Sequence, residues 1–292
     1  MTTQETQTIQ GAQPVQGAQP VQGAQATEEN PADVPAGYVA NLFDIRGRVA
    51  VVTGGGSGLG AAISTGFAQA GARVVVVDIN DEGAAATVQT VEAQGGEARA
   101  LHLDVIDRAA VDAVADTVAD ELGSVDILVN SAGTAFRCPA EDFPEERFDS
   151  IVALNLKGTY LCCQSFGRKM LAQGKGSIIN MASIGSFIAY PLSSAYLASK
   201  GGVLGVTRVL ALEWRERGVR VNGIGPTLMQ SPMTTAAAQR TSLTADFIKA
   251  RMLRPRLGLP RELIGAAIFL ASDASELVTG HTIMCDDGYL VA

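Results

Sequence analysis

The fold of this chain can be recognised from one short stretch, Val49-Ala-Val-Val-Thr-Gly-Gly-Gly-Ser-Gly-Leu-Gly-Ala-Ala-Ile63. The apolar run Val49–Val52 is typical of a buried strand, and the alanine-rich segment Ala61–Ala70 that follows has helical periodicity. Between them, glycines at 54, 58 and 60 allow a tight turn, a close approach of the backbone to a pyrophosphate and close helix–strand packing. We therefore predict a strand, a turn and a helix whose free N–H groups can bind phosphate.

The same alternation continues from Asn41 to the C-terminus, with short β-branched runs separated by alanine-rich segments of helical period. Long helices are expected at Glu146–Gln173 and Ala195–Arg217. We predict strands at Val49–Val52, Arg73–Val77, Ala98–Leu103, Ile127–Asn130, Ser177–Met181, Arg220–Ile224 and Thr282–Met284. Because parallel strands need crossovers of helical length, the sequence predicts the α/β class: a single-domain Rossmann fold with a doubly wound seven-stranded parallel sheet and helices on both faces.

An acidic residue, Asp78, ends the second predicted strand, 18 residues after Gly60. A dinucleotide-binding fold uses an acid at this place to bind the hydroxyls of the adenosine ribose. Its charge would repel a 2′-phosphate, and neither Ile79 nor Asn80 supplies the arginine that NADP would need. The sequence therefore predicts NAD as the cofactor.

The candidate catalytic residues are Tyr196 and Lys200, four residues apart on one predicted helix, together with Ser183 and Asn155. A phenol is a poor base at neutral pH, but a nearby ammonium and a positive nicotinamide ring would favour its anion. Ser183 follows the fifth predicted strand, so its hydroxyl is expected at the carboxyl edge of the sheet, where ligands bind in doubly wound folds.

From about Asn41 to Ala292 the chain resembles the short-chain dehydrogenase/reductase family. The motifs that carry the resemblance are Thr53-Gly-Gly-Gly-Ser-Gly-Leu-Gly60, Asp104-Val105, Asn130-Ser131-Ala132-Gly133 and the set Asn155, Ser183, Tyr196 and Lys200. The resemblance implies that this last set is catalytic, with Asn155 holding a water that connects Lys200 to solvent. It also implies a homotetramer with the helices at Glu146–Gln173 and Ala195–Arg217 in a subunit interface.

The cofactor residues expected from these motifs lie mostly in the segments that follow the predicted strands, and Tyr196 and Lys200 lie on a predicted helix. They are Gly54, Ser57, Gly58, Leu59, Gly60, Asp78, Asp104, Val105, Asn130, Ala132, Gly133, Tyr196, Lys200, Pro226 and Thr227. The chain departs from the family pattern at Ser131, where a second asparagine is usual, and at Pro226-Thr227, where Pro-Gly is usual. A third departure is Asp287-Gly288-Tyr289 in place of Asp-Gly-Gly.

The substrate is expected to be a small hydroxylated molecule. Several framework stretches are similar to those of gluconate-type and polyol dehydrogenases, among them Leu210-Ala-Leu-Glu-Trp214 and Ala271-Ser-Asp-Ala-Ser275. Arg137, just beyond the fourth strand, is a candidate ligand for a substrate carboxylate, or a solvated loop residue. The segment Thr227–Arg254, expected to close over the substrate, is rich in Ala, Thr and Gln, which favours a sugar, polyol or sugar acid.

Two alternatives stay open at this point. The first is a ketoreductase of acyl, steroid or aromatic substrates on the same scaffold. The second is a non-catalytic dinucleotide sensor that binds a protein partner, which would have no need of Tyr196 and Lys200. The leading hypothesis is an NAD-dependent enzyme that interconverts a secondary alcohol and a ketone.

Composition excludes several other classes of function. The net charge is −8, with 47% hydrophobic residues, and an acidic chain without clustered cations would repel a nucleic-acid backbone. No stretch approaches the ~18 apolar residues of a membrane span, and no charged segment precedes an apolar one near the start, so we expect a cytoplasmic protein. The four cysteines lack Cys-x-x-Cys or Cys/His spacing, so we expect buried thiols and no metal site.

Residues 1–38 differ from the rest of the chain in composition. Val15-Gln-Gly-Ala-Gln-Pro20 is repeated from Val21 onward, in a segment rich in Gln, Gly, Ala and Pro. Such a segment cannot bury enough apolar surface to offset the entropy of ordering it. We expect a disordered N-terminal tail at 1–38 and one catalytic domain at 39–292.

Overall fold

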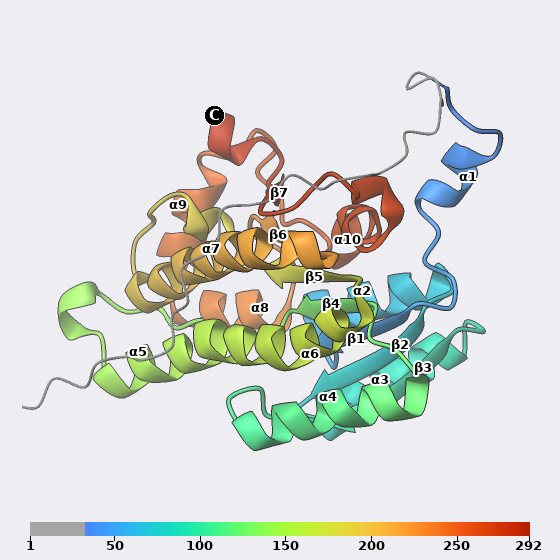
Figure 1. The fold of residues 1–292 in the computed structure, drawn as a ribbon. Coiled ribbons are helices and arrows are strands. Elements are labelled where there is room, and N and C mark those ends of the chain that lie inside the picture. Colours follow the sequence, from blue (N-terminus) through green and yellow to red (C-terminus); the bar gives the residue numbers. More distant parts are fainter. Residues whose placement is uncertain (1–32) are drawn as a thin grey trace, which may run out of the picture. The chain divides into compact units, whose positions relative to one another are not determined.

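The computed structural model describes residues 33–292 of the chain (Figure 1). Most of the predicted disordered tail, residues 1–32, therefore lies outside the described residues. The first element is a short helix, α1 (Tyr38–Leu42), and the sheet begins seven residues after it, at Val49. Among residues 33–292, no helix combines the length and the apolar character needed to cross a membrane.

The core of the domain is a sheet of seven parallel strands in the order β3-β2-β1-β4-β5-β6-β7 (Figure 1). The strands are β1 (Val49–Thr53), β2 (Arg73–Asp78), β3 (Glu97–His102), β4 (Ile127–Asn130), β5 (Gly176–Met181), β6 (Val219–Pro226) and β7 (Thr282–Cys285). The prediction of a doubly wound seven-stranded parallel sheet is confirmed. The third strand begins and ends one residue earlier than predicted, and β6 continues to Pro226. Strand order reverses between β1 and β4, which places a ligand crevice beyond their carboxyl ends.

Helices cover both faces of the sheet, because successive residues of the central strands are apolar and point to opposite faces. On one face, Ala50 and Val52 of β1 pack with α2 (Gly58–Gln69), α3 (Asp81–Glu92) and α10 (Ile264–Ala271). On the other face, Val49 and Val51 pack with α4 (Arg108–Leu122), α6 (Thr159–Gln173) and α7 (Ser194–Trp214). Both faces of the strands are thus buried, as expected for a parallel sheet.

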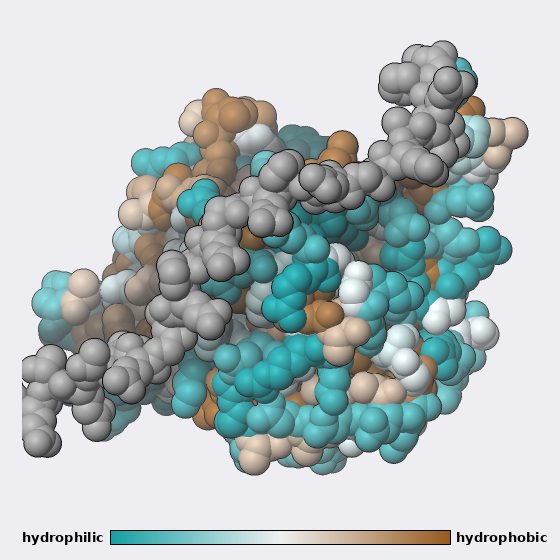
Figure 2. All heavy atoms as spheres, viewed as in Figure 1, coloured by the Kyte–Doolittle hydropathy of each residue, from teal (hydrophilic) through white to brown (hydrophobic). Residues whose placement is uncertain are grey.

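The outer side of α4 shows the amphipathic pattern that keeps such a helix at the surface. Its exposed positions include Asp116, Asp120 and Glu121, whereas Val111 and Val118 are completely buried. The surface over this helix is largely hydrophilic in Figure 2. The buried stripe of α4 packs into the hydrophobic cluster that the sheet shares with α6.

The long helix predicted at Glu146–Gln173 is interrupted in the structure. It consists of α5 (Glu145–Val152), one wider π-helical turn at Ala153–Gly158, and α6. π-helical turns are rare in proteins overall, and those that occur are often found at functional sites. The wider turn contains Asn155, one of the predicted catalytic residues.

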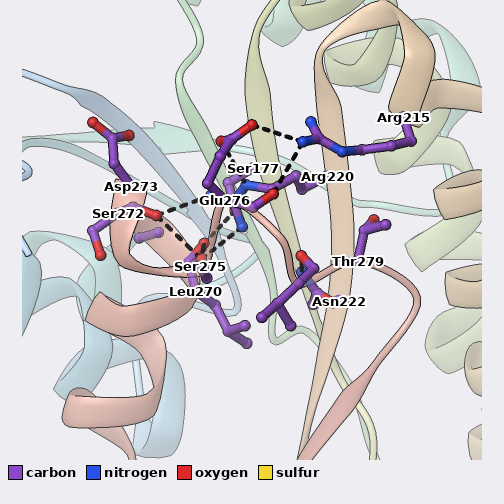
Figure 3. Close-up of polar contacts among 12 residues, drawn as sticks. Ser177, Arg215, Arg220, Asn222, Leu270, Ser272, Asp273, Ser275, Glu276 and Thr279 are labelled. Atoms are coloured by element: carbon purple, nitrogen blue, oxygen red, sulfur yellow. Dashed lines mark hydrogen bonds and ion pairs between the residues drawn. The ribbon is translucent and has the colours of Figure 1, made fainter. Parts of the chain in front are cut away.

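A polar network fastens the start of β6 to the segment that follows α10 (Figure 3). Arg220 is 4% exposed and donates from its guanidinium to the Ser275 hydroxyl at 2.7 Å and to the Ser272 carbonyl at 3.1 Å. Arg215 donates to the Glu276 carboxylate at 2.7 Å beside it. Because β6 ends at the ligand crevice, this network sets the position of one wall of the site.

Candidate active site

A cavity of about 880 Å³ lies beyond the carboxyl ends of the strands. The glycine-rich turn after β1 forms part of its wall. A Cβ atom on Gly54 would lie 2.8 Å from the backbone of Ala132, and one on Gly60 would lie 2.2 Å from the Gly54 carbonyl oxygen. Ser57, the residue before α2, makes no side-chain hydrogen bond to the helix. The turn is thus closed to side chains and leaves the amino end of α2 available to a phosphate.

Asp78 lies at the end of the cavity formed by β1 and β2. One carboxylate oxygen accepts from the Gly56 N–H at 2.9 Å and the other accepts from the Asn80 N–H at 2.9 Å. Two backbone donors therefore hold the carboxylate in one orientation beside the glycine-rich turn. A ribose with two free hydroxyls fits this arrangement, since the carboxylate oxygens retain lone pairs to accept from them.

Ser183, Tyr196 and Lys200 meet at the other end of the same cavity. Ser183 follows β5, and its hydroxyl accepts from the Gly185 N–H at 3.0 Å. Lys200, one turn after Tyr196 on α7, has its ammonium nitrogen 5.9 Å from the centre of the Tyr196 ring. Lys200 is 7% exposed and donates to the Met181 carbonyl at 2.6 Å. The structure thus brings three of the predicted catalytic residues together.

The electrostatics of this group differ from the expectation for Tyr196. Burial raises the pKa of Tyr196, while a hydrogen bond from Ser183 and the charge of Arg137 lower it. Burial also lowers the pKa of Lys200 to about 8. Desolvation of the phenol is therefore the largest influence on the pKa of Tyr196, and Arg137 is the cation whose charge lowers this pKa.

Asn155 supports the site from behind the cavity wall. It is fully buried, and its side-chain oxygen accepts from the Thr134 N–H at 2.8 Å. Its side-chain amide donates to the Thr134 carbonyl at 2.9 Å and to the Ser199 hydroxyl at 3.0 Å. These bonds tie the loop after β4 to α7, which carries Tyr196.

The remaining predicted cofactor residues fall into two groups. Asn130 is 3% exposed and bonds across to Asn180 on β5, with its amide nitrogen 2.8 Å from the Asn180 oxygen, so it braces the sheet. The others border the cavity directly: Gly54, Ser57, Gly58, Leu59, Asp104, Val105, Ala132, Gly133, Pro226 and Thr227. Gly60 is the predicted glycine that does not line the cavity, and it packs against the Gly54 carbonyl of the turn. The hydroxyl of Thr227 is buried and has no hydrogen-bond partner among the described residues 33–292.

Sequence reasoning missed other residues of the cavity wall, among them Tyr190 and Arg147. Tyr190 is 7% exposed and hydrogen-bonds to Ser183, and Arg147 on α5 lies with its guanidinium 5.4 Å from the centre of the Phe136 ring. Neither occurs in a motif that points to them, although Tyr190 lies between Ser183 and Tyr196 in the sequence. The cover of the cavity comes from α8 (Pro232–Arg240) and α9 (Leu243–Lys249), within the segment predicted to lie over the substrate.

The residues of this cavity fit a dinucleotide. A Cβ atom on Gly54 or Gly60 would collide with the backbone of the turn or its neighbour, and the Asp78 carboxylate is oriented by two backbone N–H groups. Among residues 33–292 the buried Thr227 hydroxyl has no hydrogen-bond partner, so it is available to a ligand. One cavity thus joins a ribose-binding acid to a serine, a tyrosine and a lysine. This combination defines an oxidoreductase that uses a nicotinamide dinucleotide and acts on alcohol groups.

Comparison with known proteins assigns the family. A family model described as enoyl-(acyl carrier protein) reductase matches residues 54–290, and the chain belongs to the short-chain dehydrogenase/reductase family. It is 45% identical over 251 residues to the D-threitol dehydrogenase of Mycolicibacterium smegmatis, covering 85% of this chain and 96% of that protein. It is 39% identical over 251 residues to the NAD-dependent glycerol dehydrogenase of Listeria innocua, covering 85% of this chain and 96% of the relative.

A solved structure shows the same fold. It is the crystal structure of a protein assigned as an NAD(P)-dependent gluconate 5-dehydrogenase from Beutenbergia cavernae, with NADP bound at low occupancy. The TM-score is 0.81 at 39% identity, and the match covers 86% of this chain and all of the other.

Proposed function

We propose that this protein oxidises a secondary alcohol of a sugar, polyol or sugar acid to a ketone with NAD. The observation that carries the proposal is the single cavity that joins Asp78 at one end to Ser183, Tyr196 and Lys200 at the other. The names of the relatives support the substrate class, since they include a D-threitol dehydrogenase and a glycerol dehydrogenase.

In this reaction Tyr196, as a phenolate, takes the proton of the substrate hydroxyl. Ser183 donates a hydrogen bond to the reacting oxygen, where charge develops. Lys200 stabilises the phenolate and binds the nicotinamide ribose. Asn155 is proposed to hold the water that connects Lys200 to solvent. The nicotinamide ring, when bound, accepts the hydride from the substrate carbon.

The proton acceptor is tested by Tyr196→Phe, which keeps the ring and removes the hydroxyl. Turnover of polyols, aldoses and aldonates should fall by roughly 10²–10⁴-fold, the range typical of positioned proton transfer, while NAD affinity is largely retained. Tyr38→Phe is the matched control, because Tyr38 is 51% exposed and does not line the cavity. If Tyr196→Phe keeps more than about a tenth of the wild-type kcat, Tyr196 is not the base.

The preference for NAD is proposed on the strength of Asp78. Its carboxylate is held beside the glycine-rich turn, where it would accept from the ribose hydroxyls and repel a 2′-phosphate. Asp78→Ala should narrow the ratio of kcat/KM between NAD and NADP, whereas Asp81→Ala, an exposed acid at the start of α3, should not. Equal or greater activity of the unmodified protein with NADP would contradict the proposal.

The substrate end of the cavity favours a hydroxylated molecule. Thr234, Thr241 and Thr244 line it and offer hydroxyl groups, and Arg137 offers a guanidinium for the carboxylate of a sugar acid. Leu228 and Ile248 also line this end, and they favour the alternative of a ketoreductase for an apolar substrate. Comparing turnover of polyols with that of acyl, steroid and aromatic ketones decides between the two.

A homotetramer in the cytoplasm completes the proposal. Side chains of α6 and α7 present apolar surface, with Tyr160 40%, Val209 44% and Leu212 81% exposed, which supports an interface on these helices. Cys162 and Cys163 are buried free thiols, which supports a reducing compartment. Light scattering of the full chain tests the tetramer, and fractionation of cells tests the location.

A further inference from the structure

Arg137 lies between the rings of two tyrosines at the substrate end of the cavity. Its guanidinium carbon is 5.5 Å from the centre of the Tyr196 ring and 5.7 Å from the centre of the Tyr190 ring. One guanidinium nitrogen donates to the Ser193 hydroxyl at 2.9 Å, and that hydroxyl donates to the Pro191 carbonyl at 2.9 Å. Arg137 is therefore held in place by the segment that leads into α7.

The backbone next to Arg137 is tied to the same segment. The Cys138 N–H donates to the Leu192 carbonyl at 3.2 Å, and Leu192 has a φ of +62°. A leucine in the left-handed region is strained, and such strain persists where the surrounding structure requires that conformation. The strained residue aligns the Tyr190–Ser193 segment with the loop after β4, which keeps the guanidinium over both rings.

Ser183 connects the two tyrosines. A hydrogen bond with the Ser183 hydroxyl lowers the pKa of each tyrosine, and the charge of Arg137 lowers both as well. Burial raises the pKa of Tyr190 beyond that of a free tyrosine, and the nearby Tyr196 raises it further. Tyr190 thus remains a neutral hydroxyl beside the proposed base.

We propose that Arg137 is a positioning residue for the reaction, whose fixed positive charge stabilises the phenolate of Tyr196. This inference rests on the proposed function, in which Tyr196 is the base. The groups that face Tyr196 are Ser183 after β5, Tyr190 before α7, Arg137 in the loop after β4 and Lys200 on α7 itself. Arg137 and Lys200 are the cations of this set.

The two cations differ in how far their charge depends on pH. Lys200 is buried, and its pKa is lowered to about 8, so it loses charge under the mildly basic conditions that favour proton removal from an alcohol. Arginine stays protonated at every pH at which a protein is folded. Arg137 therefore supplies the phenolate with a charge that Lys200 alone does not maintain.

A direct titration of Tyr196 tests this role without any substrate. The full chain has five tyrosines, so labelling their Cζ atoms for NMR gives few resonances, and that of Tyr196 is identified by its loss in Tyr196→Phe. With and without NAD, Arg137→Met should raise the Tyr196 midpoint by about 1 pH unit, the order expected for a charge about 6 Å away in a partly screened site. Arg137→Lys, which keeps the charge, should restore part of the shift.

The control is Arg147→Met, which removes another arginine of the cavity wall whose guanidinium lies over Phe136. It should leave the Tyr196 midpoint unchanged. If Arg137→Met does not fold, Arg137→Gln, which can still bond to Ser193, takes its place. If the folded Arg137→Met or Arg137→Gln protein, which lacks the charge, has the same Tyr196 midpoint as the wild type, the proposal is overturned.

Kinetics separate this role from carboxylate binding. With a neutral polyol, Arg137→Met should shift the pH profile of kcat to higher pH by the same amount as the midpoint. If only the KM for an aldonate changes, Arg137 is a substrate ligand alone and the proposal is wrong. If no polyol, aldose or aldonate is oxidised, the proposed function fails, while the titration still reports on the charge of Arg137.

Discussion

Replacing Lys200 by methionine should stabilise the fold while it removes activity. Lys200 is 7% exposed, and the acceptor of its ammonium hydrogen bond, the Met181 carbonyl, is uncharged. Within the described residues no ion pair therefore offsets the burial of this charge. Burial lowers the pKa of Lys200 from 10.5 to about 8. At about 1.4 kcal/mol per unit, a charged Lys200 destabilises the folded state by roughly 3 kcal/mol.

The pH dependence follows from which state binds the proton more tightly. The folded pKa of Lys200, about 8, lies below the unfolded value of 10.5, so the unfolded chain binds more protons between these values. The destabilisation of the folded state by charged Lys200 is therefore complete below about pH 8 and disappears as the pH rises toward 10.5. The lost hydrogen bond to Met181 subtracts about 1 kcal/mol from this difference. The free energy of unfolding of Lys200→Met should therefore exceed that of the wild type by roughly 2 kcal/mol at neutral pH, and by progressively less at higher pH.

Urea unfolding of the full chain at about pH 7 and about pH 9.5 measures this difference. Lys169→Met is the matched control, because Lys169 is partly exposed and paired with Asp116, so its loss should not stabilise the protein. Turnover and NAD affinity of Lys200→Met should both fall. The reasoning is refuted if Lys200→Met is less stable than the wild type at neutral pH, or if its gain does not shrink as the pH rises.

Two further predictions concern stability away from the cavity. Arg220→Met keeps the apolar stem but removes the charged hydrogen bonds to Ser275 and Ser272 (Figure 3). In urea titrations the free energy of unfolding should fall by about 2–4 kcal/mol. A loss below about 1 kcal/mol would show that this network is not needed for stability. Asp287 has a φ of +54° and binds Arg254 through both carboxylate oxygens at 2.6–3.0 Å. Asp287→Ala should cost about 1 kcal/mol more in thermal or urea unfolding than Asp287→Gly, because only glycine adopts this conformation without strain; equal stabilities would contradict the argument.

Local sequence patterns were sufficient for the strands and for the glycine-rich turn. Val49–Val52 and the helix that follows the glycine-rich turn could be predicted because apolar periodicity and glycine spacing act within a few residues. The start of that helix was wrong, since α2 begins at Gly58 and not at Ala61. The spacing of Tyr196 and Lys200 likewise places both on one side of α7, as in the structure. Strand ends were less certain, since β3 begins at Glu97 rather than Ala98, where no apolar residue marks the boundary.

The C-terminal turn has a backbone conformation that the motif Asp287-Gly288-Tyr289 did not reveal. Asp287 and Gly288 have φ values of +54° and +80°, so Asp287 lies in a conformation that glycine prefers. Asp286 accepts from the Gly288 N–H at 3.1 Å and from the Leu290 N–H at 3.0 Å. A positive φ is uncommon for a residue other than glycine, so the residue type did not predict it.

Other features of the site depend on residues that are distant in the chain. By itself the sequence predicted the parallel sheet and the turn that can hold a dinucleotide, because both depend on local periodicity or spacing. It also indicated Ser183, Tyr196 and Lys200 as candidate catalytic residues, through their spacing and the resemblance to the family. Only the tertiary structure placed Arg137 over Tyr196 and widened the helix around Asn155 so that its amide meets Thr134. The physical reason is that side-chain burial and electrostatic contacts depend on distances in space. These distances arise when the loop after β4 packs against α7, and a local sequence pattern does not predict them.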